Sequence, residues 1–225
     1  MSKEQQTEVH TAPLEWLAAY SAGALSDEQR LLIDCQAAME PRIGARLRQL
    51  DAVGGAYLES ARGDPLSPGF TGRLFDAIDR ADAGDTDTAP PPAPRAREAW
   101  MPAPLAAYLD ECGADLKWRK RAPGVEIAEM ARHDGARLYM MKARPGLRTP
   151  AHSHRGEEWA LILQGGYHVG EAGYRRGDLH CEDQNCVHQP VIDDDGEACI
   201  TLVYDEGPVI FANPLLRALQ PFIGI

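Results

Sequence analysis

The sequence predicts a multidomain α + β protein, in which a small four-helix domain precedes an all-β domain. Three observations support this fold class. Apolar residues recur at helical spacing up to about residue 80, and they alternate with polar residues after residue 99. Between the two patterns lies a stretch of acidic and small residues that ends in several prolines. We therefore expect a helical domain at 1–80, a Pro-rich linker at 81–98 and a second domain at 99–225.

Four amphipathic helices are expected in the first domain. Ser26 begins the second of them, because Gln29 follows three residues later in a capping-box pattern. Pro41 suits the first turn of the third helix, and Ser67 with Pro68 begins the fourth. The apolar positions that would form the interior of a small bundle are Leu14, Leu17, Ala18, Leu25, Leu31, Leu32, Cys35, Ile43, Leu47, Leu50, Val53, Tyr57, Leu74, Phe75 and Ile78.

Short runs with a period of two residues follow the linker. They occupy residues 137–142, 158–163, 178–182 and 198–204, and turns rich in Gly, Pro and Asp separate them. Many short strands at close spacing are typical of a β-sandwich or β-barrel, so this domain is predicted to be one of the two.

Charge and composition narrow the classes of partner. The formal net charge of −11 argues against direct binding to nucleic acid or to anionic lipid. No apolar run is long enough to span a bilayer, and residues 1–11 lack the apolar core of a signal peptide, so we expect a cytoplasmic protein. Five irregularly spaced cysteines agree with a reducing compartment. Cys35, Cys112 and Cys199 are expected to be buried.

A segment between Gly146 and Gly165 contains candidate metal ligands. His152 and His154 are two residues apart, so in a strand both project from the same face. Glu158 can return to that face from the next strand after a short turn. Imidazole and carboxylate ligands favour zinc, iron(II), manganese or nickel over calcium or magnesium.

A second segment, from Gly177 to His188, adds a fourth candidate ligand, His188. Together the two segments resemble the paired signature motifs of the cupin superfamily. The first segment fits its motif in full, whereas the second has Asp183 and Asn185 where cupins usually have proline and glycine. The resemblance implies a jelly-roll barrel whose metal is held by His152, His154, Glu158 and His188. Zinc is the ion we expect first.

The whole chain resembles the ChrR-type anti-sigma factors. Besides the order of helical domain, linker and cupin, the resemblance covers residues 19–26, 50–55, 188–191 and 219–222. It implies that the helical domain captures a sigma factor of the extracytoplasmic-function class and keeps it from polymerase. It also implies that a zinc-binding cupin is needed for release when singlet oxygen or related oxidants appear.

The chain departs from this family at one site. The family's helical domain holds its own zinc through an upstream histidine and a His-x-x-x-Cys-x-x-Cys motif. Aligning the flanking segments puts those three motif ligands on Gln36, Glu40 and Ile43, and only His10 lies near the upstream position. We therefore expect the helical domain to be metal-free and held together by helix packing.

Two other functions are compatible with the residues. A cupin with three His and one Glu around iron or manganese is also the site of dioxygenase-like enzymes, in which the helical domain would be vestigial. His180, Tyr167 and His168 could then act as acid or base, although core or surface positions explain each of them more simply. Alternatively, the helical segment serves dimerisation, since cupins often form homodimers. Under the leading hypothesis the mechanism is association, and no residue is catalytic.

Overall fold

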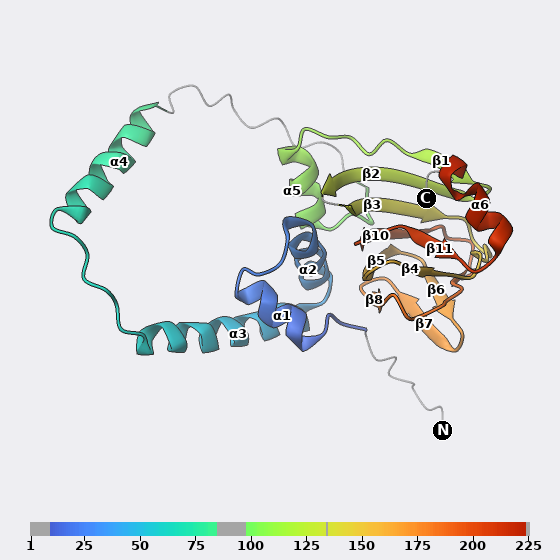
Figure 1. The fold of residues 1–225 in the computed structure, drawn as a ribbon, viewed down its shortest axis with the longest axis horizontal. Helices are drawn as coiled ribbons and strands as arrows, with labels where there is room; N and C mark the ends of the chain where they lie inside the picture. Colours follow the sequence, from blue (N-terminus) through green and yellow to red (C-terminus); the bar gives the residue numbers. More distant parts are fainter. Residues whose placement is uncertain (1–9, 85–97, 134, 224–225) are drawn as a thin grey trace.

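The structure, a computed structural model, describes residues 10–84, 98–133 and 135–223 (Figure 1). Five helices precede the strands, and a sixth follows them: α1 (Leu14–Ser21), α2 (Asp27–Met39), α3 (Pro41–Ser60), α4 (Phe70–Gly84), α5 (Ala103–Glu111) and α6 (Pro214–Ile223). The strands are β1 (Arg119–Ala122), β2 (Val125–His133), β3 (Ala136–Ala143), β4 (His152–His154), β5 (Glu158–Gln164), β6 (Gly166–Val169), β7 (Ala172–Arg175), β8 (Leu179–Glu182), β9 (Val191–Ile192), β10 (Cys199–Asp205) and β11 (Val209–Phe211).

The predicted local signals for the helices are confirmed. Ser26 caps α2 through a reciprocal pair: the backbone N–H of Gln29 donates to Ser26 Oγ at 3.2 Å, and that of Ser26 donates to Gln29 Oε1 at 3.1 Å. Pro41 occupies the first turn of α3, where its missing N–H has no helical partner to lose. Helix α4 begins a few residues after Ser67, whose carbonyl accepts the backbone N–H of Phe70.

The β-rich part is a cupin-like arrangement of one large and two small antiparallel sheets. The large sheet has the order β1-β2-β3-β10-β5-β8, and the small sheets pair β4 with β11 and β6 with both β7 and β9. All four predicted strand regions are found, as β3, β5, β8 and β10. One face of the large sheet looks toward the small sheets, because a cavity between them is lined from both sides. Alternation along the strands presents every second residue to the opposite face.

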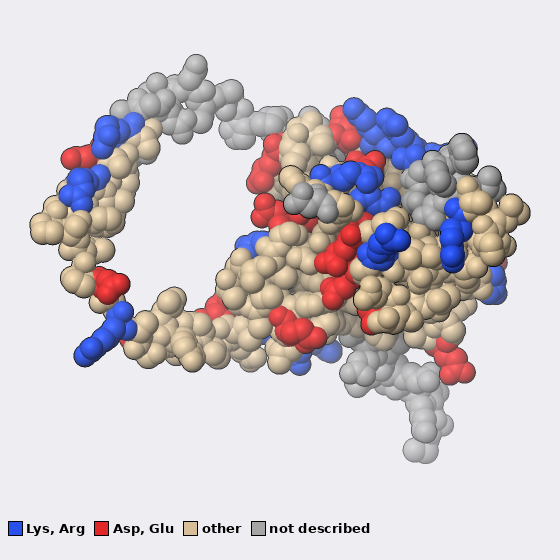
Figure 2. Space-filling model, in the orientation of Figure 1, with Lys and Arg blue, Asp and Glu red and all other residues tan. Residues whose placement is uncertain are grey.

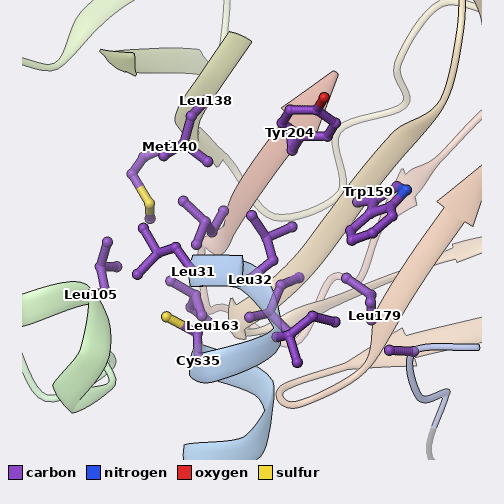
Figure 3. Packing of buried hydrophobic residues seen from close by; sticks show 14 of the residues in the cluster. Leu31, Leu32, Cys35, Leu105, Leu138, Met140, Trp159, Leu163, Leu179 and Tyr204 are labelled. Atoms are coloured by element: carbon purple, nitrogen blue, oxygen red, sulfur yellow. The ribbon is translucent and has the colours of Figure 1, made fainter. Parts of the chain in front are cut away.

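That opposite face of the large sheet is covered by helices. Residues of α1, α2, α3 and α5 share one hydrophobic core with residues of β3, β5, β8 and β10 (Figure 3). In Figure 3, Leu31 and Leu32 of α2 lie between Leu105 of α5 and the sheet. The buried members of this core with the largest side chains are Leu17, Leu32, Ile33, Ile43, Leu105, Leu109, Leu138, Met140, Trp159, Leu161 and Leu163. The helices and the barrel therefore do not have separate interiors.

The expected self-contained bundle of four helices is thus not what forms. Helix α4 is exposed along residues 70–81, and so is nearly all of residues 51–60 in α3. Figure 1 shows α4 apart from the other helices. The physical reason is that α2 buries its apolar face against the sheet, which leaves no interior for α4 to complete. A helix that sequence analysis did not predict, α5, packs beside α2 instead and is the fourth helix of the shared core. The linker boundary remains a prediction, since residues 85–97 lie outside the described part.

The cysteine predictions are confirmed at two of three positions. Cys35 and Cys199 are buried, whereas Cys112 is exposed because it caps the carboxyl end of the short helix α5. Within the described residues, no helix is both long and apolar enough to cross a membrane.

Candidate metal centre

The backbone brings the two histidine segments together. His152 and His154 form the ends of β4, and a β-bridge pairs His152 with His188. The backbone N–H of His152 donates to the carbonyl of His188 at 3.0 Å, and the reverse bond measures 2.9 Å. Because both bonds are made by the main chain, the three imidazoles are held on neighbouring strands whatever occupies the site.

The three imidazoles converge through their Nε2 atoms. Nε2 of His188 lies 2.9 Å from Nε2 of His152 and 3.1 Å from Nε2 of His154. Nitrogen ligands 2.0–2.1 Å from one ion are themselves about 2.8 to 3.4 Å apart in octahedral or tetrahedral geometry. Nδ1 of His152 is 2.7 Å from the carbonyl of Pro150, so it carries the proton and leaves Nε2 free to bind an ion. The residues present fit a divalent transition metal.

The electrostatics of the site also favour a metal. Burial lowers the pKa of His152 to about 4 and that of His154 to about 3, so both rings are neutral at ordinary pH. Burial also lowers the pKa of His188. Neutral imidazole is the form that coordinates a metal ion. On the other side of the rings, Nδ1 of His154 and Nδ1 of His188 are buried without a hydrogen-bond partner, 3.4 Å from Glu158 and 3.2 Å from Glu182 respectively.

Glu158 stands beside the cluster at the start of β5. Its carboxylate lies 3.4 Å from Nδ1 of His154, outside the group formed by the three Nε2 atoms. In the sheet register it lies between Asp205 and Glu182. Burial, together with the charges of Asp205 and Glu182, raises the pKa of Glu158 to about 8. A cation in the site would offset this excess of negative charge.

Sequence analysis did not identify Glu182 as part of the centre. Oε1 of Glu182 lies 2.8 Å from Nε2 of His180 and 3.2 Å from Nδ1 of His188. His180 and Glu182 are two residues apart on β8, the same spacing that identified His152 and His154. That spacing was the available signal, and it was overlooked because the cupin motif does not require these residues.

The residues considered as acid or base, His180, Tyr167 and His168, occupy core or surface positions. Tyr167 OH lies 2.8 Å from Nδ1 of His180, and both residues are buried. His168 lies at the surface with 46% of its side chain exposed, 3.3 Å from Asp193.

A cavity of about 450 Å³ opens between the large sheet and the small sheets next to the histidines. Its walls are mostly apolar, and His152, Glu158, His180 and His188 line one part of it. The volume is within the range of small-molecule pockets.

The positions aligned with the family's other zinc site lie at the contact between helices and cupin. Gln36 is fully buried, and its Nε2 donates to the carbonyls of His10 at 3.0 Å and Gly177 at 3.1 Å. Its Oε1 accepts the backbone N–H of Ala12 at 3.0 Å. Ile43 is buried in the shared core, and Glu40 lies beside Gly177. The ring of His10 packs on Tyr174, with the centroids 4.6 Å apart.

Comparisons with known proteins agree with this arrangement. Residues 113–207 match the family model described as the ChrR Cupin-like domain. The chain is 33% identical over 209 residues to the Anti-sigma-E factor ChrR of Cereibacter sphaeroides, covering 93% of this chain and 95% of that protein. It also matches a chain in the crystal structure of Rhodobacter sphaeroides SigE in complex with the anti-sigma ChrR. That match has a TM-score of 0.69 and 30% identity, and it covers 87% of this chain and 98% of the other. The chain belongs to the ChrR family of anti-sigma factors.

Proposed function

We propose that this protein is an anti-sigma factor that sequesters a sigma factor of the extracytoplasmic-function class, under the control of a metal ion in its cupin. The observation that carries the proposal is similarity along nearly the whole length to a ChrR anti-sigma factor, together with a solved relative in complex with SigE. We place the protein in the cytoplasm, where a sigma factor meets polymerase.

The outer half of α3 and helix α4 supply a surface for such a partner. Large apolar side chains between residues 53 and 78 are 39–79% exposed. They are Val53, Tyr57, Leu58, Leu66, Phe70, Leu74, Phe75 and Ile78. Figure 2 shows uncharged surface between the charged side chains along these two helices. Amphipathic helices with exposed apolar faces are a common means of protein recognition.

The charge of the chain suits the same partner. A net charge of −11 repels DNA but attracts a protein whose own surface is basic because it binds DNA. The net negative charge of the chain would speed association with a basic sigma factor and make the rate sensitive to salt.

We further propose that His152, His154, His188 and Glu158 hold the metal, with zinc first and iron, manganese or nickel as the other candidates. Nε2 of each histidine would face the ion, and the Nδ1–H of His152 donates to the carbonyl of Pro150. When bound, the metal ties β4, the segment around His188 and the start of β5 to one point. Oxidation or ligation there would change how these segments are held, and this change is the proposed signal for release.

The test is co-expression with the sigma factor encoded nearest to this protein, followed by size exclusion and metal analysis. We expect a complex under reducing, metal-replete conditions and one metal ion per cupin. Recovery of the protein without any sigma factor under those conditions would contradict the proposal. A fixed mass of twice the monomer, unchanged by sigma factors, would instead indicate the homodimer.

The cavity beside the histidines favours a second candidate, a cupin dioxygenase-like enzyme. Its volume of about 450 Å³ could admit a small substrate next to the metal. Iron in the isolated protein, together with oxygen uptake on a small organic substrate, would support this function. Zinc in the isolated protein, without oxygen uptake, would argue against the enzyme and leave the anti-sigma factor as the supported function.

A further inference from the structure

The side chains on the two faces of strand β8 contact different parts of the protein. It pairs with β5 in the register Glu158 with Glu182, Trp159 with Cys181, Ala160 with His180 and Leu161 with Leu179. Because side chains alternate along a strand, His180 and Glu182 share one face, and Leu179 and Cys181 share the other. His180 lines the cavity beside the candidate metal centre, and Glu182 contacts His180 and His188 while also lining the crevice beside Trp16. Leu179 and Cys181 pack with the core that the sheet shares with the helices.

The inner face supports His188. The Nε2 of His188 faces the other two imidazoles, so its proton is on Nδ1, and Nδ1 lies 3.2 Å from Oε1 of Glu182. The same carboxylate oxygen lies 2.8 Å from Nε2 of His180. His180 in turn accepts the hydroxyl of Tyr167 at Nδ1, at 2.8 Å, so its own proton is on Nε2 and donates to Glu182. Glu182 thus contacts two imidazoles: His180 at hydrogen-bond distance, and His188 at an ion-pair distance without an aligned hydrogen bond.

The outer face supports the helices. The backbone N–H of Leu179 donates to the carbonyl of His10 at 2.8 Å, and the Leu179 side chain belongs to the core shared with α1 and α2. Cys181 lines a crevice with Trp16 of α1. The ring of Trp16 stacks on that of Trp159, the partner of Cys181, with centroids 3.4 Å apart.

Two hydrogen bonds just before β8 strengthen the same contact. The backbone N–H of His10 donates to Oδ1 of Asp178 at 2.8 Å, and Gln36 donates to the carbonyl of Gly177 at 3.1 Å. The second cupin motif, Gly177 to His188, therefore begins under the helices and ends in the metal centre.

We propose that Glu182 and His180 are positioning residues for the metal ligand His188, and that through β8 they couple metal binding to the docking of α1 and α2 on the cupin. The proposal rests on the metal centre of the proposed function. A metal ion that holds His188 also holds Glu182, and Glu182 fixes the strand whose other face carries the helices. Metal loading should then stabilise the docked helices, and loss of the metal should loosen them.

The first test measures metal affinity. Outer carboxylates that orient a histidine ligand typically contribute about 10- to 100-fold to metal affinity. Zinc affinity, from competition with a chromophoric chelator, should fall by about that factor in Glu182→Gln and by less in His180→Gln. Glu171→Gln is the matched control, since it removes one carboxylate from the exposed β6–β7 turn. The absorption spectrum of bound cobalt(II) should change in Glu182→Gln and stay unchanged in Glu171→Gln.

The second test measures docking by hydrogen exchange. Zinc should slow exchange in peptides covering α1, α2 and the backbone N–H of Leu179 in the wild type. At a zinc concentration that saturates both proteins, the slowing should be smaller in Glu182→Gln, while exchange in β2 and β3 stays the same.

Either of two results would contradict the proposed coupling. One is that Glu182→Gln binds zinc as tightly as the wild type, and the other is that zinc does not change hydrogen exchange in α1 and α2. His152→Ala separates these failures from failure of the metal centre itself. If His152→Ala binds zinc as tightly as the wild type, the proposed centre is wrong.

Discussion

Helices α2 and α4 have the same kind of sequence and opposite surroundings. They contain 13 and 15 residues, and both carry apolar side chains at helical spacing. In α2, Leu32 and Ile33 are fully buried against the large sheet and α5. In α4, Phe75 is 59% exposed and Ile78 is 45% exposed. The difference shows that an apolar stripe on a helix predicts a packing surface for it, but does not identify the element that packs there. Helix α2 packs against elements of the same chain, whereas the apolar residues of α4 stay exposed.

The largest effect is expected from removing apolar volume in α2. Leu32→Ala should lower the free energy of unfolding by about 2 to 5 kcal/mol, because a fully buried leucine is replaced by a cavity. The matched change in α4, Leu74→Ala, should cost no more than about 0.5 kcal/mol, since Leu74 is 45% exposed. Chemical denaturation followed by circular dichroism measures both.

The same variant tests whether the core is shared. In Leu32→Ala the helical signal and the β-sheet signal should shift together, because both sides contribute to one core. A variant that loses only its helical signal, with the barrel transition unchanged, would show two independent interiors and would break the comparison.

A smaller loss of unfolding free energy is expected from removing the polar contact between the helices and the cupin. Gln36→Ala leaves the carbonyls of His10 and Gly177 and the backbone N–H of Ala12 without their side-chain partner. Buried groups left unsatisfied in this way should cost about 2 to 3 kcal/mol in total. Gln49→Ala, at an exposed position of α3, is the control and should have little effect on the melting temperature. Equal melting temperatures for the two variants would show that Gln36 does not hold the helices in place.

Helix α4 should show the reverse behaviour, with an effect on the partner and little effect on folding. Phe75→Ala should weaken binding of the sigma factor about tenfold, because truncating an aromatic side chain at an interface typically costs about 1 to 2 kcal/mol. Its melting temperature should match the wild type, since Phe75 is exposed in the free protein. Thr71→Ala, at an exposed and uncharged position of the same helix, is the control for binding. Unchanged affinity in Phe75→Ala, measured by titration calorimetry, would remove α4 from the interface.

Much of this architecture could be predicted from local sequence signals. The caps at Ser26 and Pro41 depend only on neighbouring residues, and both are found. The convergence of His152, His154 and His188 follows from strand alternation and from the spacing of two motifs. These features are local, or they recur in fixed form across a superfamily.

The rest depends on contacts between distant residues. Residues Leu31 and Leu32 read equally well as the interior of a bundle or as a face packed on a sheet, and only the tertiary structure decides between them. Gln36 looked like the remnant of a lost zinc site, yet it bridges segments that lie 26 and 141 residues away. Glu182 is a different case: its spacing from His180 is a local signal, but the cupin motif does not require it.

The smallest signal, that of a single thiol, can report whether α2 stays docked. Burial raises the pKa of Cys35 to about 12, so its thiol should react with a disulfide reagent only when α2 leaves the sheet. Cys112 is exposed and should react first. Cys199 provides the matched control, because burial also raises its pKa to about 12 but it belongs to a barrel cluster away from the helices. In Gln36→Ala, labelling of Cys35 should be about tenfold faster and that of Cys199 unchanged, as measured by mass spectrometry of peptides. Equal acceleration at both cysteines would mean that the whole chain opens at once and that α2 has no docking equilibrium of its own.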